Sequence, residues 1–243
     1  DIINSAIERR RLQVQDKHAV PKDRALDSTI SIMREGYLFI KNRADKYNSK
    51  LFEARIFGQK VICLTGEEGC RLFYNDEYFV RKGAAPLRIQ KTLFGRGAIQ
   101  TMDGEAHADR KELFLSLTTE EHAKKLNKMT MEELKGSIEY WQSKRPVVLF
   151  NELKEIMCKV ACGFAGIPLQ KQELKDRAED FVLMIYSFGS VGPQYWKGKR
   201  ARCRAEKWLE ALIKEVREGS LQAPEDSALY KIAGHKEADG KSL

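Results

Sequence analysis

The sequence predicts a mainly α-helical protein with a small β-sheet. Most segments place apolar residues at helical spacing between capping and stop signals, whereas only residues 51–65 alternate with the period of a strand. With 243 residues, 42% of them hydrophobic, the chain can build one large domain or two small ones around a sizeable core. The sequence contains no internal repeat and no low-complexity tract.

The amino-terminal part is predicted to combine a polar leader with one short helix. Residues 1–25 are polar and highly charged, and Pro21 interrupts any helix there, so we expect a partly ordered leader. Asp27 or Ser28 can then cap a short helix. The helical spacing that defines it is carried by Ile30, Met33, Tyr37 and Leu38.

A β-hairpin is predicted over residues 51–65, with its turn at Gly58 and Gln59. Gly66 then begins a compact helix with an acidic first turn. Residues 78–100 mix glycine, proline, arginine and apolar residues without a sustained period, which predicts a long loop with at most one helical turn. The alternating positions of the hairpin are Phe52, Ala54 and Ile56 before the turn and Val61, Cys63 and Thr65 after it.

The second half is predicted to be helical apart from one strand. A helix is expected over residues 118–142, and Pro146–Phe150 is typical of a short strand. Asn151 can cap a helix that stops at Gly166, and two further helices are expected over residues 174–193 and 204–220. The basic residues just before the last of these helices, residues 197–204, are interpreted as a solvated helix entrance. Burial is predicted for Ile156, Val160, Cys162, Phe164, Trp208, Leu212 and Val216.

The most informative stretch is LFGRGAIQTMDGEAHADRKELFLSLTT, residues 93–119. Asp103 can cap a helix whose first turns carry His107, Arg110 and Lys111. Residues 107 and 111 project from one helix face with residue 110 beside them, so the three donors suit a multiply charged anion such as a carboxylate or phosphate. A cationic face that is only solvated explains the same spacing, and both interpretations stay open.

Charge and cysteine content exclude several classes of protein. The formal charge of +8, from 43 basic and 35 acidic residues, is interleaved, so it permits anionic partners and we expect no nucleic-acid partner. We predict no membrane span and no secretory signal, which favours a cytoplasmic protein. The five cysteines lack zinc-ribbon spacing and are expected to be reduced thiols, with no metal site. The common hydrolase and nucleotide-triphosphatase motifs are missing.

Several long segments carry a family resemblance: LDSTISIMREGYLFIKNR, LFGRGAIQTMDG, HADRKELFLSLTT, VVLFNELKEIMCKVACGFAGIPL and FGSVGPQYWKGKRARCRAEKWLE. Through them the chain, from about Leu26 onwards, resembles the amino-terminal half of the bacterial fatty-acid peroxygenases of the cytochrome P-450 superfamily. The resemblance implies the amino-terminal, distal-side portion of the cytochrome P-450 fold, incomplete at the C-terminus. Residues 26–243 would then be part of a single domain.

The resemblance implies a haem-thiolate enzyme that uses hydrogen peroxide to hydroxylate long-chain fatty acids at the α or β carbon, without a redox partner protein. By similarity Arg81, His107 and Lys111 would hold the haem propionates, and Arg110 is a weaker candidate. Gln100 matches a distal-pocket position where glutamine favours hydroxylation and histidine is typical of members that decarboxylate fatty acids. The matched substrate-channel positions are Ile89, Leu93, Phe94, Ile185 and Phe188.

The family pattern also includes residues that this sequence does not contain. The sequence ends at Leu243, before the Arg-Pro pair that would bind the substrate carboxylate and before the cysteine loop, and none of its five cysteines stands in a haem-ligand context. We therefore expect the axial cysteine to lie outside this chain and the chain to be inactive alone. The alternatives are a fatty-acid decarboxylase of the same family, which gives terminal alkenes, and a non-enzymatic helical module that binds an anion or lipid.

Overall fold

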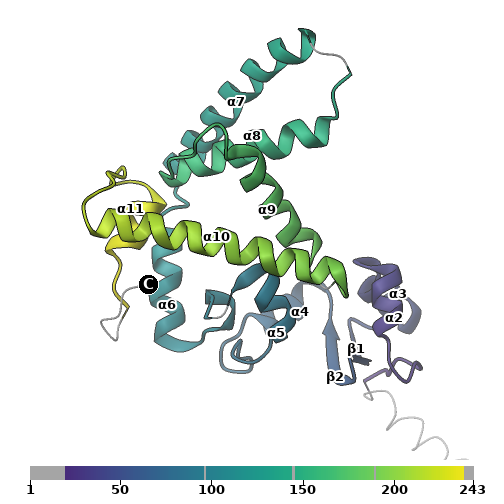
Figure 1. Cartoon of the computed structure of the whole chain (residues 1–243). Helices are drawn as coiled ribbons and strands as arrows, with labels where there is room; N and C mark the ends of the chain where they lie inside the picture. The colour runs from purple at the N-terminus through teal and green to yellow at the C-terminus, as the bar shows by residue number, and fades with distance from the viewer. Residues whose placement is uncertain (1–19, 96, 144–145, 189, 238–243) are drawn as a thin grey trace, which may run out of the picture. The chain divides into compact units, whose positions relative to one another are not determined.

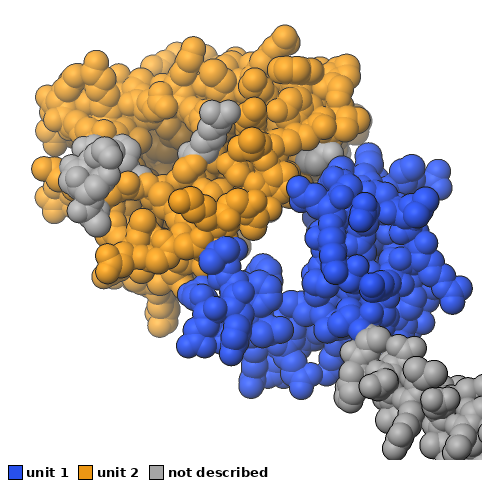
Figure 2. Space-filling model, turned by 90° about the horizontal axis from the view of Figure 1, so that it is seen from below, with its two compact units in different colours: residues 1–80 blue, residues 81–243 orange. Residues whose placement is uncertain are grey.

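The computed structural model describes residues 20–95, 97–143, 146–188 and 190–237, and in them the protein is mainly helical with one small sheet (Figure 1). The predicted fold class is therefore confirmed. The chain divides into two compact units, Asp1–Val80 and Arg81–Leu243, which Figure 2 colours separately. Most of the predicted leader lies outside the described residues, and the division into a leader and one domain stays a prediction.

The sheet of the first unit is an antiparallel hairpin of β1, Leu51–Ile56, and β2, Gln59–Leu64. Phe52 pairs with Cys63, whereas the predicted turn would have paired Phe52 with Thr65. The turn residues are Phe57 and Gly58, with φ of 51° and 73°, so the predicted turn was wrong by one residue. A two-residue hairpin loop of this kind needs positive φ at both positions, and Gln59 is already paired in the ladder.

The core of the first unit lies between this hairpin and the helices before it. The described helices of the unit are α2, Thr29–Glu35; α3, Leu38–Tyr47; and α4, Gly66–Phe73. Phe39 and Phe52 are fully buried, with Ala54 and Cys63 beside them. The predicted short helix is confirmed as α2, which ends at Gly36 with φ 55°. The four residues that carried its spacing stay outside the core of the unit and are exposed: Ile30, Met33, Tyr37 and Leu38.

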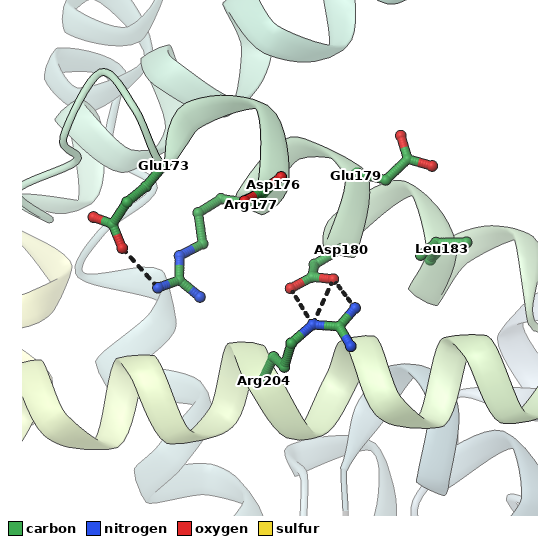
Figure 3. A pocket seen from close by; sticks show the side chains of 7 residues that line it. All are labelled: Glu173, Asp176, Arg177, Glu179, Asp180, Leu183 and Arg204. Carbon is green, nitrogen blue, oxygen red and sulfur yellow. Dashed lines mark hydrogen bonds and ion pairs between the residues drawn. The ribbon is translucent and has the colours of Figure 1, made fainter.

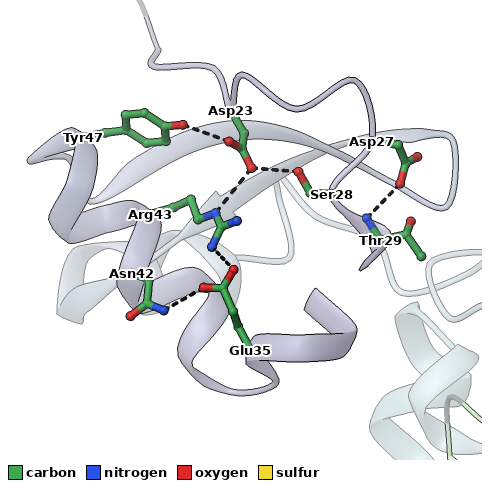
Figure 4. Close-up of polar contacts among 8 residues, drawn as sticks. All are labelled: Asp23, Asp27, Ser28, Thr29, Glu35, Asn42, Arg43 and Tyr47. Atoms are coloured by element: carbon green, nitrogen blue, oxygen red, sulfur yellow. Dashed lines mark hydrogen bonds and ion pairs between the residues drawn. The ribbon is translucent and has the colours of Figure 1, made fainter. Parts of the chain in front are cut away.

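A buried carboxylate fastens the end of the predicted leader to this unit (Figure 4). Asp23 accepts hydrogen bonds from Ser28 Oγ at 2.7 Å and Tyr47 Oη at 2.9 Å, and Arg43 Nε lies 3.4 Å away. Burial raises the pKa of Asp23, but these hydrogen bonds and the Arg43 charge outweigh it and leave the pKa below its ordinary value. Lys22 also forms a parallel bridge with Glu53 of β1.

The second unit is built from helices. In chain order its described elements are α5, Leu87–Ile89; the π-helix η2, Gln90–Phe94; the 3-10 helix η3, Ile99–Thr101; α6, Gly104–Leu115; α7, Glu120–Ser143; α8, Leu149–Ala165; α9, Leu174–Tyr186; α10, Pro193–Arg217; and α11, Ala228–Gly234. The long helix α10 packs against α9, α11 and η2, while α8 packs against α7 and α9 (Figure 1). The two long helices α9 and α10 thus support the turn η2.

Two predictions for this unit were wrong. Pro146–Phe150 forms no strand in the described part of the chain, because α8 already begins at Leu149 after an extended Val148, and Asn151 lies inside its first turn. No described strand neighbours this segment to pair with it. The predicted stop at Gly166 is confirmed, with φ 75°. Beyond the predicted helices the structure contains α11, which Ser227 caps.

Candidate functional site

The start of α6 is joined to the loop at Arg81 through the carboxylate of Asp103. One carboxylate oxygen accepts the backbone N–H of Arg81 at 2.7 Å, and the other accepts that of Lys82 at 2.8 Å. Asp103 stands at the predicted N-cap position, but its side chain makes no cap hydrogen bond to α6. The hydrogen bonds from Arg81 and Lys82 lower the pKa of Asp103, so the carboxylate stays ionised at neutral pH.

The predicted anion-binding residues lie on the two segments that Asp103 joins. The Arg81 guanidinium lies 3.8 Å from Asp103, and His107 lies in the first turn of α6, four residues after Asp103. Lys111 follows His107 by four residues on α6, so their side chains leave the same helix face. His107 is half-buried and Lys111 is exposed. The folded chain thus gathers cationic donors from two segments that are distant in sequence.

Arg110, the fourth cationic candidate, has a different environment. Its guanidinium donates to the Gly97 carbonyl oxygen and forms an ion pair with Glu237, and its side chain is only 12% exposed. Burial lowers the pKa of Arg110, and nearby Asp109 only partly opposes this effect. Asp109 in turn lies 3.1 Å from His235 Nε2. Arg110 therefore links α6 to the segment after α11 through its ion pair with Glu237. We do not count it with His107 and Lys111 as an anion-binding residue.

The predicted channel residues of η2 meet the end of α9. Leu93 packs against the cluster of Met184, Ala201 and Ala205. The Phe94 ring meets the Phe188 ring edge-on, with centroids 6.3 Å apart.

The remaining channel candidates extend this apolar surface. Phe188 keeps 48% of its surface exposed, and Ile185, three residues earlier at the end of α9, keeps 64%. Ile89 is half-buried in α5, which runs directly into η2. The second unit therefore presents an apolar surface that water still reaches.

Gln100 lies in the 3-10 turn η3, which immediately precedes Asp103 and α6. Its side chain is exposed. The turn follows Gly97, whose carbonyl oxygen accepts from Arg110. Gln100, the predicted distal-pocket residue, thus lies in a short segment with a fixed contact at each end. Arg110 binds the Gly97 carbonyl oxygen before it, and Asp103 binds the Arg81 and Lys82 N–H groups after it.

A hollow of about 370 Å³ between α9 and α10 is polar (Figure 3). Asp180 is buried and points from α9 toward Arg204 on α10, which it pairs with through two guanidinium nitrogens. Arg177 beside it pairs with Glu173 at 2.9 Å. The interpretation of residues 197–204 as a solvated entrance was therefore incomplete, because Arg204 joins two helices. The sequence gives no signal for this pairing.

The cysteines and acidic residues do not form a metal centre in the described part of the chain. Cys158 and Cys162 lie buried on one side of α8, against Ala178 of α9. The hydrogen bond from Cys162 lowers the pKa of Cys158, and the pKa of Cys162 is raised in return. Within the described ranges, no helix is both long and apolar enough to cross a membrane.

The chain is similar in sequence and in fold to known proteins. No protein-family model matches the chain. Cytochrome P450EX alpha, solved with myristic acid, is 40% identical and superimposes with a TM-score of 0.86, over 93% of this chain and 54% of its own. Ligand-free cytochrome P-450 OleT is 34% identical with a TM-score of 0.88, over 92% of this chain and 54% of its own. A curated cytochrome P-450 of Synechocystis sp. is 26% identical over 225 residues.

The fold is that of part of a cytochrome P-450. The chain spans about half the length of the relatives it matches, 54% of the solved structures and 49% of the curated protein. Within that class the chain resembles the amino-terminal half of the CYP152 fatty-acid peroxygenases, to which P450EX alpha, P450SP alpha and OleT belong, so the resemblance inferred from the sequence is confirmed.

A cytochrome P-450 implies a haem cofactor, and the donor set at α6 fits one edge of it. Haem propionates are anions, and the groups gathered here are the cationic side chains of Arg81, His107 and Lys111. Asp103, the carboxylate that joins the two segments, accepts two backbone N–H groups and lies 3.8 Å from the Arg81 guanidinium. The junction therefore combines cationic side chains with a carboxylate whose oxygens are already hydrogen-bonded.

Proposed function

We propose that this chain is part of a haem-thiolate peroxygenase that uses hydrogen peroxide to hydroxylate long-chain fatty acids at the α or β carbon. The supporting observation is the Asp103 junction, which holds the loop of Arg81 against the helix of His107 and Lys111. An anion-binding group and an exposed apolar surface in the same unit suit a cofactor with propionates and a substrate with an acyl chain. When bound, haem with a thiolate ligand supplies the oxidation of an unactivated C–H bond by peroxide.

The side chains of Arg81, His107 and Lys111 would hold the propionates. Each can donate to a carboxylate oxygen, and hydrogen bonds in which both partners are charged are roughly twice as strong as neutral ones. His107 can donate a hydrogen bond in its neutral or its protonated form. These residues would orient the cofactor and take no part in proton transfer.

The substrate class follows from the apolar surface. P450EX alpha was solved with myristic acid and an OleT variant with arachidonic acid, and we propose a long-chain fatty acid for this protein. Each methylene that leaves water for an apolar wall contributes about 0.8 kcal/mol, so a long acyl chain can bind through such contacts alone. The residues that would line the acyl channel are Ile89, Leu93, Phe94, Ile185 and Phe188.

Gln100 would favour hydroxylation over decarboxylation. A carboxamide neither gains nor loses a proton near neutral pH, whereas histidine titrates there and can act as an acid or base beside the substrate. Because hydrogen peroxide supplies the oxygen atom and the reaction with it needs no added electrons, we propose that no redox partner protein is required. Decarboxylation to terminal alkenes is the second candidate, and the Gln100 position distinguishes the two.

The axial thiolate is proposed to come from a cysteine outside these residues. Cys158 and Cys162 are buried between α8 and α9, and Cys63 is buried in the core of the first unit, where burial raises its pKa. A thiol that is buried and protonated is a poor iron ligand. The remaining two, Cys70 and Cys203, are exposed on helices.

The experiment is to purify the protein that carries this chain with haem, record its carbon-monoxide difference spectrum, and supply peroxide with myristic acid. We expect a thiolate-type spectrum and 2- or 3-hydroxymyristic acid, measured by mass spectrometry. Protein that shows neither would remove the peroxygenase proposal. Binding of haem-free protein to anionic lipid vesicles, with no product, would favour the non-enzymatic module instead.

A further inference from the structure

Helix α10 reaches back to the turn η2 through one side chain. Arg202 donates from Nη1 to the Leu93 carbonyl oxygen at 2.5 Å, across 109 residues of sequence. Its Nε donates to Glu206, one turn further along α10, at 2.8 Å. Glu206 therefore orients the guanidinium, and the guanidinium satisfies a carbonyl at the end of a π-helix. The side chain joins the two segments by a charge-assisted hydrogen bond.

Gly95 shows how closely the guanidinium covers the end of η2. A Cβ atom at residue 95 would lie 2.4 Å from Arg202 Nη2, which is too close for any real side chain. Gly95 has φ 86° and ψ 163°, a conformation that is essentially restricted to glycine. Its N–H donates to the Gln90 carbonyl oxygen at 2.7 Å and closes the wide turn. Glycine is therefore favoured by its backbone conformation, and the missing Cβ leaves room for the Arg202 guanidinium in its present position.

The surface of α10 around Arg202 is shaped to receive η2. Ala201 and Ala205 are almost completely buried, and their small side chains let the turn approach the helix closely. The Leu93 side chain packs against the buried cluster that these alanines form with Met184. Leu93 is thus held at its carbonyl by Arg202 and at its side chain by this cluster.

The opposite side of the apolar surface is fixed to the same helix. A Cβ atom at Gly198 would lie 2.1 Å from Ser187 Cβ, so only glycine allows the end of α9 to come this close. Ser187 is fully buried, and its hydroxyl donates to the Gln194 carbonyl oxygen at 2.9 Å. Phe188, the next residue, meets the Phe94 ring. Both rings of this pair are therefore positioned by contacts with α10.

We propose that Arg202 is a positioning residue that fixes the Leu93–Phe94 wall of the acyl channel and thereby sets which fatty-acid chain lengths bind. The inference rests on the proposed fatty-acid function. A π-helix holds one residue more per turn than an α-helix, so relaxation to an α-turn rotates the following side chain by roughly 100°. Loss of the Arg202 contact would permit this change and turn Phe94 away from Phe188.

The test compares Arg202→Met with Arg202→Lys, and uses Arg200→Met as the matched control. Arg200 is an exposed arginine two residues earlier on α10. The measurements are the dissociation constants of saturated fatty acids from C12 to C18 and amide hydrogen exchange of residues 90–95. We expect Arg202→Met to weaken binding of the preferred fatty-acid length about 10-fold, which is a loss of about 1.4 kcal/mol of binding free energy. The same variant should flatten the chain-length preference and speed amide exchange at Gly95 at least 10-fold. Arg202→Lys should recover part of each effect, and the control should match wild type.

Unchanged length preference together with unchanged Gly95 exchange in both Arg202 variants would overturn the inference. An equal effect of Arg200→Met would overturn it too, because the cause would then be general positive charge on α10. If the wild-type protein binds no fatty acid, the proposed function fails, and Gly95 exchange alone decides whether Arg202 holds the turn. Should Arg202→Met not fold, Arg202→Lys supplies the same comparison. Lysine keeps the positive charge, but its single ammonium group can reach only one of the two acceptors, the Leu93 carbonyl oxygen or Glu206.

Discussion

Replacement of Arg81 by glutamine isolates the charge at the proposed propionate site. The backbone N–H of residue 81 holds Asp103 whatever its side chain, so Arg81→Gln leaves the junction closed and removes only the guanidinium. A hydrogen bond to a charged group contributes about 1.5–3 kcal/mol. The Arg81 side chain is 30% exposed, so solvent screening puts its contribution near the low end of that range, about 1.5–2 kcal/mol.

That loss corresponds to a roughly 10- to 30-fold rise in the dissociation constant of haem. The assay is haem transfer from the purified protein to excess apomyoglobin, followed by absorbance. Lys82→Gln is the matched control, because Lys82 also donates its backbone N–H to Asp103 and its side chain is not assigned to the site. Equal haem retention by wild type and Arg81→Gln, or equal loss in both variants, would refute the propionate assignment.

Three further predictions concern product choice, acid stability and the fastening of α6. Gln100→His should raise the ratio of terminal alkene to hydroxy acid by severalfold in product analysis, and an unchanged ratio would remove Gln100 as a determinant. Asp23 has a lowered pKa, so its stabilisation is complete above the unfolded value of 3.8 and is lost as pH falls through the folded value. Asp23→Asn should therefore lower the urea midpoint more at pH 7 than at a pH below 3.8, and an equal loss at both would contradict this. Glu237→Gln leaves the mostly buried Arg110 without its ion-pair partner. It should lower the free energy of unfolding in urea by about 1–3 kcal/mol, and an unchanged free energy of unfolding would contradict this.

Local sequence patterns predicted those helices and strands whose formation depends on residues close together in the sequence. The hairpin, α6 and the glycine stop of α8 depend on alternation, capping position and positive φ, all of which lie within a few residues. The spacing of Ile30, Met33, Tyr37 and Leu38 predicted α2, but it continued across Gly36, where α2 ends, and so did not separate α2 from α3. A period is informative only within one unbroken helix.

The polar contacts that shape the site could not be predicted, because their partners are far apart in sequence. Arg202 reaches a carbonyl 109 residues earlier, and Asp180 pairs with Arg204 across two helices. Arg110 illustrates the same limit, since its spacing matched the anion-binding group but its charge is directed to Glu237. Spacing identifies which residues share a helix face, while the tertiary fold decides which partner each one meets.

The central claim is peroxide-dependent hydroxylation of a fatty acid, and isotope labelling tests it most directly. Protein purified with haem would be supplied with myristic acid and hydrogen peroxide labelled with oxygen-18, in unlabelled air and without any reductase. The account predicts that mass spectrometry finds the label in the new hydroxyl group at the α or β carbon, in most of the product. Hydroxy acid without the label, or no oxidised product at all, would contradict it.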